Sequence, residues 1–250
     1  MSIVLAVLSL LTAAPRSNAQ SSACGASTGL TLSAGVGQND RVDATASPFQ
    51  FRGRGLQLAA ALVRAHGRFC LTVDGEGGAK LLASRQGTSA TERLIEGDGG
   101  VGVLHTTSMR SLSLGVEARG LLAVTDHTYG DPRHIVATYR IGALSLGPAL
   151  RWERPLFRGH AVVQLSSPLI ALVDHPYVAV WTTDPEPSFR LASLTQFRAG
   201  HAALSYEWSA WHGVASVASY RLTAVRYDDV HPLRSLSQDI VFGVRVPFVP

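Results

Sequence analysis

Charged residues are scarce in this chain. They make up 16% of its 250 residues, against roughly 25% in an average soluble domain. Two cysteines are too few for a disulfide scaffold, and a net charge of +4 is too small to imply a nucleic-acid partner. Lys80 is the sole lysine among 22 basic residues, so arginine supplies almost all positive charge. With 46% apolar residues, the chain is also unlike a disordered protein.

Long hydrophobic runs are missing as well, with one short exception at the start. Residues 1–14 form an apolar run that is too short to span a bilayer as a helix and has the length of a signal-peptide core. The small residues Ser17 and Ala19 predict cleavage after Ala19, which makes residues 1–19 a signal peptide and residues 20–250 the exported domain. A buried N-terminal helix or strand, or a lipoprotein anchored at Cys24, are the alternatives.

What recurs instead is alternation with a period of two. Between residues 111 and 125 one face is apolar, and Glu117 and Arg119 lie on the other. The apolar face, which we expect to meet lipid, consists of Leu112, Leu114, Val116, Ala118, Leu122 and Val124. Residues 69–81 and 240–248 repeat the pattern. These segments are longer than ordinary globular strands, which average 5 or 6 residues.

The alternating segments predict ten strands: 28–38, 48–64, 68–84, 91–105, 110–126, 134–154, 160–176, 188–210, 214–228 and 235–249. Short turns and longer polar loops alternate between them, as in transmembrane barrels. We expect an all-β fold, an antiparallel transmembrane up-and-down β-barrel of about ten strands, with eight or twelve as alternatives. Aromatic belts are expected at both rims, one with Phe69, Trp152, Trp208, Trp211 and Phe248, the other with Phe49, Phe51, Tyr129, Tyr139, Tyr177, Phe189 and Tyr227.

The whole exported domain resembles Gram-negative outer-membrane β-barrel proteins. The most specific segment is residues 240–248, which resembles the terminal-strand signal read by the barrel assembly machinery because it combines a glycine, alternating apolar residues and a late aromatic. The resemblance implies an outer-membrane location, contact with outer-membrane lipid, and the barrel assembly machinery as a partner during biogenesis. It indicates neither an oligomeric state nor a ligand.

The polar face of the predicted strands indicates a charged interior. A barrel of about eight strands is filled by side chains, and open channels need about sixteen, so we expect paired charges that plug the lumen or leave a narrow polar conduit. The expected lumen network is Arg52, Arg54, Asp74, Glu76, Lys80, Glu96, Asp98, Glu117, Arg119, Arg140, Arg151, Glu153, Glu207, Arg221 and Arg245.

Chemistry could also reside at the outer rim, where three predicted loops carry Asp and His together. An Asp that orients a His could activate water for hydrolysis, and omptin-type outer-membrane proteases are ten-stranded barrels with such groups at this rim. The candidates are Asp126, His127, His134, Asp174, His175, Asp229 and His231. Because an acidic partner motif is not evident, we expect these groups to be dispersed and solvated.

The sequence therefore favours a non-enzymatic outer-membrane barrel that is structural or recognises partners through its loops. An outer-membrane hydrolase and a soluble secreted β-sandwich or barrel are the alternatives. No cofactor, metal site or nucleic-acid surface is expected. Export would permit a disulfide between Cys24 and Cys70, which both fall near the short-turn side.

Overall fold

A computed structural model describes residues 28–44, 47–86, 89–109, 111–130, 135–175, 189–211, 214–228 and 232–248. The predicted signal peptide and Cys24 lie outside these residues. The described part contains twelve β-strands, and no helix within it is long and apolar enough to cross a membrane. The strands are β1 (Gly29–Asp43), β2 (Ser47–His66), β3 (Phe69–Ser84), β4 (Ala90–Thr106), β5 (Leu112–Tyr129), β6 (Ile135–Leu156), β7 (Gly159–Ser166), β8 (Ile170–Asp174), β9 (Phe189–Ser193), β10 (Phe197–Trp211), β11 (Val214–Tyr227) and β12 (Leu233–Val246).

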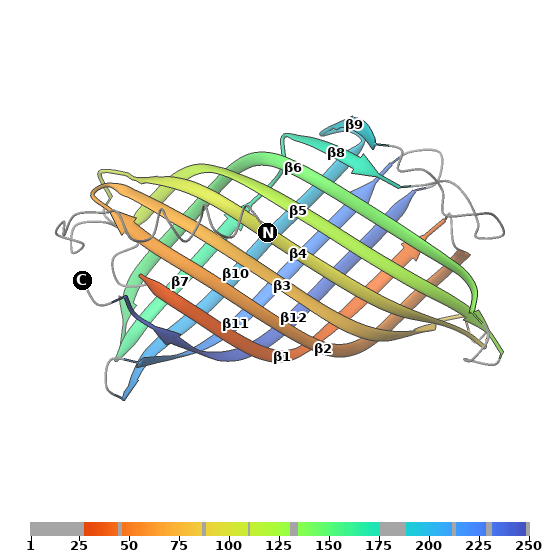
Figure 1. The fold of residues 1–250 in the computed structure, drawn as a ribbon, viewed down its shortest axis with the longest axis horizontal. Helices are drawn as coiled ribbons and strands as arrows, with labels where there is room; N and C mark the ends of the chain where they lie inside the picture. Colours follow the sequence, from red (N-terminus) through yellow and green to blue (C-terminus); the bar gives the residue numbers. More distant parts are fainter. Residues whose placement is uncertain are drawn as a thin grey trace, which may run out of the picture.

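Ten of these strands close into an antiparallel barrel, and β8 and β9 lie outside the ring (Figure 1). Sequential neighbours pair from β1 to β7, then β7 pairs with β10, and β11 and β12 complete the wall. Closure occurs where β1 meets β12, in a continuous register from Leu30 opposite Val246 to Asp43 opposite Leu233. The predicted ten-stranded barrel is therefore confirmed.

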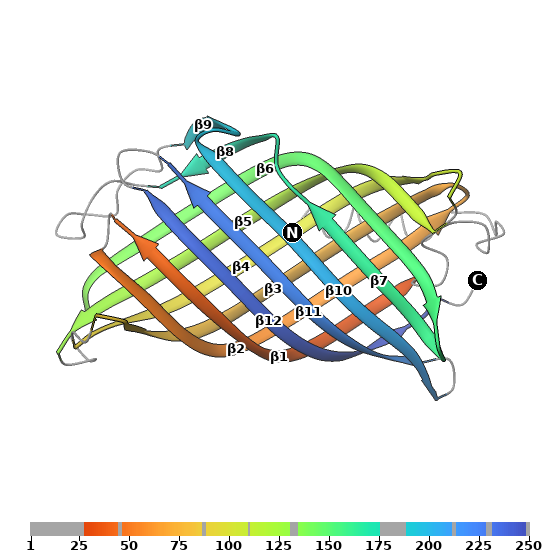
Figure 2. The ribbon, with the colours of Figure 1, turned by 180° about the vertical axis from the view of Figure 1, so that it is seen from behind.

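The wall is interrupted where two long predicted strands divide. The predicted strand 160–176 splits into β7 and β8 around Pro168, and the predicted strand 188–210 splits into β9 and β10 just before Phe197. Strand β6 pairs with β7 through residues 149–156 at its inner end and with β8 through residues 142–146 near its middle. Figure 2 shows the β8–β9 pair at the edge of the barrel, beside β6.

The outer surface of the barrel is aliphatic. Leu56, Leu81, Val116, Leu122 and Phe242 are each more than half exposed, and similar side chains occur on every strand of the wall. A soluble protein rarely exposes continuous apolar surface on this scale. Leucine, valine and phenylalanine facing outward, with Glu117 and Arg119 buried inside, are the arrangement that a lipid bilayer selects.

The two ends of the barrel differ. We call the end with the longer connections, such as those from β5 to β6 and from β11 to β12, the outer end, and the opposite end the inner end, following the usual orientation of such barrels. Phe69 and Trp208 are exposed at the inner end, as predicted for an aromatic belt. At the outer end the prediction was partly wrong, because Phe51, Tyr139 and Tyr227 point into the barrel and are buried there. Phe51 and Tyr227 join an interior apolar cluster with Leu82, Leu94, Ile141, Val173, Phe197 and Leu233.

Candidate functional site: the charged lumen

Arg119 occupies the middle of the lumen and binds three carboxylates. Its guanidinium lies 2.7 Å from Glu117 Oε1 on the same strand and 2.8 Å from Asp74 Oδ2 on β3, and it also contacts Asp98 on β4. Alternation along β3, β4 and β5 turns all four side chains inward. One cation thus compensates three buried acids, and the group retains a local excess of negative charge.

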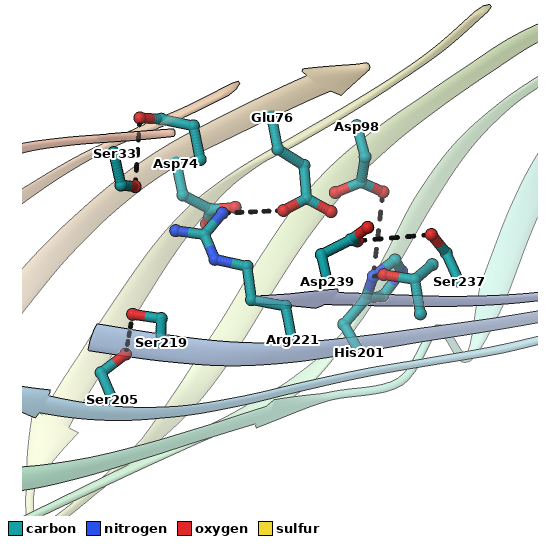
Figure 3. A network of polar contacts seen from close by, with 12 residues as sticks. Ser33, Asp74, Glu76, Asp98, His201, Ser205, Ser219, Arg221, Ser237 and Asp239 are labelled. Atoms are coloured by element: carbon teal, nitrogen blue, oxygen red, sulfur yellow. Dashed lines mark hydrogen bonds and ion pairs between the residues drawn. The ribbon is translucent and has the colours of Figure 1, made fainter. Parts of the chain in front are cut away.

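Two contacts cross the lumen beside this group. Arg221 on β11 places Nη1 2.7 Å from Glu76 Oε2 on β3, and His201 on β10 places Nδ1 3.8 Å from Asp98 Oδ2 on β4 (Figure 3). These strands are far apart in the ring, so the contacts connect opposing walls rather than neighbouring strands. The middle of the barrel is therefore spanned by side chains.

Lys80 forms a second cluster toward the outer end. Its Nζ lies 2.5 Å from Glu96 Oε1 and 3.0 Å from Asp239 Oδ1, and Ser237 accepts a further hydrogen bond. The lysine side chain is fully buried. Gly37 on β1 makes room for it, because a Cβ at this position would lie 1.8 Å from Asp239 Oδ1 and 2.7 Å from Lys80 Cε.

Pairs at the inner end complete the network. Arg245 on β12 contacts Glu207 on β10, and Arg151 Nη2 lies 2.7 Å from Glu153 Oε1 on β6. All four side chains are nearly buried. Charge pairing at each level explains how a barrel of this width accommodates ionised groups that would be costly to bury alone.

The lumen as a whole is acidic. Among the described residues six bases and ten acids point inward, an excess of four acids. The bases are Arg41, Lys80, Arg119, Arg151, Arg221 and Arg245; the acids are Asp43, Asp74, Glu76, Glu92, Glu96, Asp98, Glu117, Glu153, Glu207 and Asp239. The sequence predicted a near balance, so the imbalance is a finding of the structure.

A cavity of about 100 Å³ remains beside these charges. Uncharged residues of β1, β2, β7, β10 and β11 line it together with seven ionisable ones: Asp74, Glu76, Arg119, Arg151, His201, Glu207 and Arg221. This volume accommodates a few water molecules hydrogen-bonded to the polar lining.

Comparisons with known proteins agree with this architecture. No protein-family model and no curated protein sequence matches the chain. Its structure is similar to that of the outer membrane protease OmpT from Escherichia coli, with a TM-score of 0.52 and 7% identity, over 88% of this chain and 97% of that chain. The chain therefore has the fold of an outer-membrane β-barrel.

Two autotransporter domains are also similar. The transport unit of AIDA-I from Escherichia coli has a TM-score of 0.45 at 9% identity, covering 88% of this chain and 90% of its own. The translocator domain of NalP from Neisseria meningitidis has a TM-score of 0.42 at 11% identity, covering 86% and 88%. At 7% identity the likeness to OmpT shows a shared fold alone.

The rim Asp and His candidates that the structure describes do not share one face of the barrel wall. Asp126 lies on the outer face of β5 and accepts a hydrogen bond of 2.7 Å from Thr138. Asp174 pairs with Arg140, at 3.4 Å. His134, Asp229 and His231 lie outside the described residues.

The remaining two candidates, His127 and His175, point inward and have acidic partners. His127 Nδ1 lies 3.2 Å from Glu92 Oε1, and His175 Nε2 lies 3.5 Å from Asp43 Oδ2. The four side chains are at most 5% exposed and do not line the cavity described above. Both histidines are paired with acids and buried, so the expectation of solvated groups was wrong for these two residues.

Three members of the predicted lumen network lie elsewhere. Arg52 and Arg54 are exposed on the outer face of β2, because the buried neighbour Phe51 takes the inward position in the apolar cluster of the outer end. Arg140 follows the outward alternation of β6 and pairs with Asp174. The other predicted members point inward.

The sequence reasoning missed four inward charges: Arg41, Asp43, Glu92 and Asp239. Arg41 and Asp43 form an ion pair of 2.9 Å at the end of β1, in a segment predicted to be a loop. Asp239 directly precedes the outward Ile240, so strict alternation along β12 would have identified it. Cys70 is fully buried and faces inward near Val63, Leu104 and Ala149, whereas its predicted partner Cys24 is outside the described residues.

Proposed function

We propose that this barrel is non-enzymatic, acting as a closed membrane scaffold that recognises partners through its outer loops and passes at most a narrow stream of small ions. The observation that carries the proposal is the pair of cross-lumen contacts, Arg221 with Glu76 and His201 with Asp98. Together with the Arg119 group they fill the middle of the barrel and leave a cavity sized for a few waters.

The acidic excess adds an expectation about any residual path. With ten acids against six bases inside, cations would be favoured over anions in the lumen. The proposal therefore predicts the ion selectivity as well: any current through the lumen should be carried mainly by cations.

Single-channel recording in planar bilayers tests both statements. Wild-type protein should show no steady open-pore current, and Glu76→Ala combined with Arg221→Ala should raise the conductance with a reversal potential that indicates cation preference. Arg68→Ala, in the exposed turn between β2 and β3, is the matched control and should change nothing. A large, steady wild-type current, or anion preference in the double variant, would contradict the proposal.

The rim hydrolase receives less support from the geometry. At the outer end the described residues form two acid–histidine pairs, Asp43 with His175 and Glu92 with His127. Surrounding side chains bury both pairs away from solvent. Tyr227 packs edge-on against His175, and both Phe51 and Tyr129 pack edge-on against His127. A catalytic acid–base pair needs access to a substrate pocket, and these pairs are better explained as structural.

A further inference from the structure

Exposed arginines lie on the outward face of the barrel at its outer end. This is the level at which Phe51, Tyr139 and Tyr227, predicted for an outward aromatic belt, point inward instead. The exposed members on described strands are Arg52, Arg54, Arg93, Arg190, Arg198, Arg226 and Arg234. Their side chains lie at the level where the lipid-facing apolar surface gives way to the outer connections. On the outward face of the described strands these arginines outnumber the acids at the same end, Asp40, Asp126, Asp174 and Asp228, so this rim is net basic although the lumen is acidic.

Three of these arginines form a continuous row. Arg198 on β10 is directly opposite Arg226 on β11, and Arg226 is directly opposite Arg234 on β12. Adjacent strands are about 4.8 Å apart, and like charges directly opposite one another destabilise a sheet. The row therefore carries an unfavourable repulsion that a bound anion would relieve.

Asp228 is an acid beside this row, and it neutralises only part of the row's charge. Arg226 Nε donates hydrogen bonds of 2.6 and 2.9 Å to the Asp228 carboxylate, and these bonds lower the pKa of that carboxyl. Arg198 donates to the carbonyl oxygen of Leu194 at 3.3 Å. Asp228 is thus the one acid that the described residues place beside these three guanidinium groups, and this described group keeps a net positive charge.

Below the row the same face is apolar. Leu236 follows Arg234 by two positions on β12, and Leu204, Tyr220 and Ile240 continue the exposed surface toward the middle of the barrel. Two residues along a strand span about 7 Å, so a charged headgroup at the row would place its acyl chains along this surface. Guanidinium forks match phosphate oxygens in bidentate geometry.

We propose that the outward row Arg198–Arg226–Arg234 binds the phosphate groups of an anionic, phosphorylated lipid in the outer leaflet, whose acyl chains lie along β10, β11 and β12. Charge complementarity and the apolar surface beneath the row select a lipid over a soluble anion. This inference is independent of whether the lumen conducts.

Native mass spectrometry of the full chain in neutral detergent, titrated with monophosphoryl lipid A, measures the affinity. The triple variant Arg198→Gln/Arg226→Gln/Arg234→Gln should bind at least about tenfold more weakly. The matched control Arg68→Gln/Arg154→Gln/Arg158→Gln removes the same number of exposed arginines at the inner end and should bind like wild type. Asp228→Asn, which removes the competing carboxylate, should bind more tightly than wild type, a change that a purely structural role would not produce.

Heat-dependent gel mobility shows whether each variant has folded, and Arg234→Gln alone replaces the triple variant if that one does not fold. Phosphatidylcholine and inorganic phosphate are the two further probes, and both should bind far more weakly than the lipid. Three results would overturn the proposal: lipid binding by the triple variant as tight as by wild type, an equal loss of binding in the inner-end control, or equal affinity for phosphatidylcholine. Inorganic phosphate binding as tightly as the lipid would also overturn it, since the apolar surface would then play no part.

Discussion

Replacing Arg119 by methionine tests the central group of the lumen. Methionine keeps an unbranched side chain of moderate length and removes the charge that Asp74, Asp98 and Glu117 share. Removing one partner of a buried ion pair typically costs about 3–5 kcal/mol. Glu117 retains hydrogen bonds from Ser166 at 2.9 Å and Gln164 at 3.3 Å, and the adjacent cavity gives water access to Asp74. We therefore expect the lower end of the range, a loss of about 3 kcal/mol in the free energy of unfolding.

Urea unfolding in lipid vesicles, followed by tryptophan fluorescence and gel mobility, measures this loss. Arg68→Met in an exposed turn is the control and should shift stability by less than about 0.5 kcal/mol. Adding Asp74→Asn and Asp98→Asn to Arg119→Met should recover most of the stability, because the uncompensated charges are then gone. A loss below about 1 kcal/mol, or a triple variant no more stable than Arg119→Met, would refute the assignment of Arg119 as the shared counter-ion.

Two further predictions concern the lipid face and the cysteines. Leu122 pairs with Gly97 and Gly142 near the middle of the wall, so Leu122→Arg should cost about 2–4 kcal/mol, whereas Leu114→Arg near the inner end should cost about 0–1 kcal/mol; equal costs in vesicle unfolding would contradict this placement. If Cys24 and Cys70 are bridged, Cys24→Ser and Cys70→Ser should each lower stability by about 3–4 kcal/mol under oxidising conditions and act non-additively. Reagent-accessible thiols in unfolded, unreduced wild-type protein would exclude the bridge.

Most of the barrel could be predicted from alternation, since lipid and lumen impose opposite polarity on successive residues. Leu114, Val116 and Leu122 were placed correctly by this rule. The rule failed at the outer end, where the interior is apolar. There Phe51 points inward and Arg52 points outward, the reverse of what their polarity predicts. The same inversion placed Arg54 wrongly.

Strand ends and contacts across the lumen were harder to predict. β1 extends to Asp43 through residues that looked like a polar loop, because their charges pair inside the barrel. Alternation shows which residues point inward but says nothing about which opposing strand they meet. The pairing of Arg221 with Glu76, and of Lys80 with Asp239, depends on ring order and register, which only the closed structure supplies.

Acidic and basic residues of this chain are separated between the lumen and the outward face, although the net charge is only +4. Among the described residues six bases and ten acids point inward, while exposed arginines outnumber acids on the outward face at the outer end. Inside, carboxylates of nearby strands cluster around shared cations such as Arg119 and Lys80, and the pair of Arg221 with Glu76 connects opposing walls. Outside, Arg198, Arg226 and Arg234 lie opposite one another, and their repulsion destabilises this part of the sheet unless negative charge is close by. A lipid phosphate bound at the row would supply that charge, so the lipid-binding proposal follows from the same separation of charge between the lumen and the outward face.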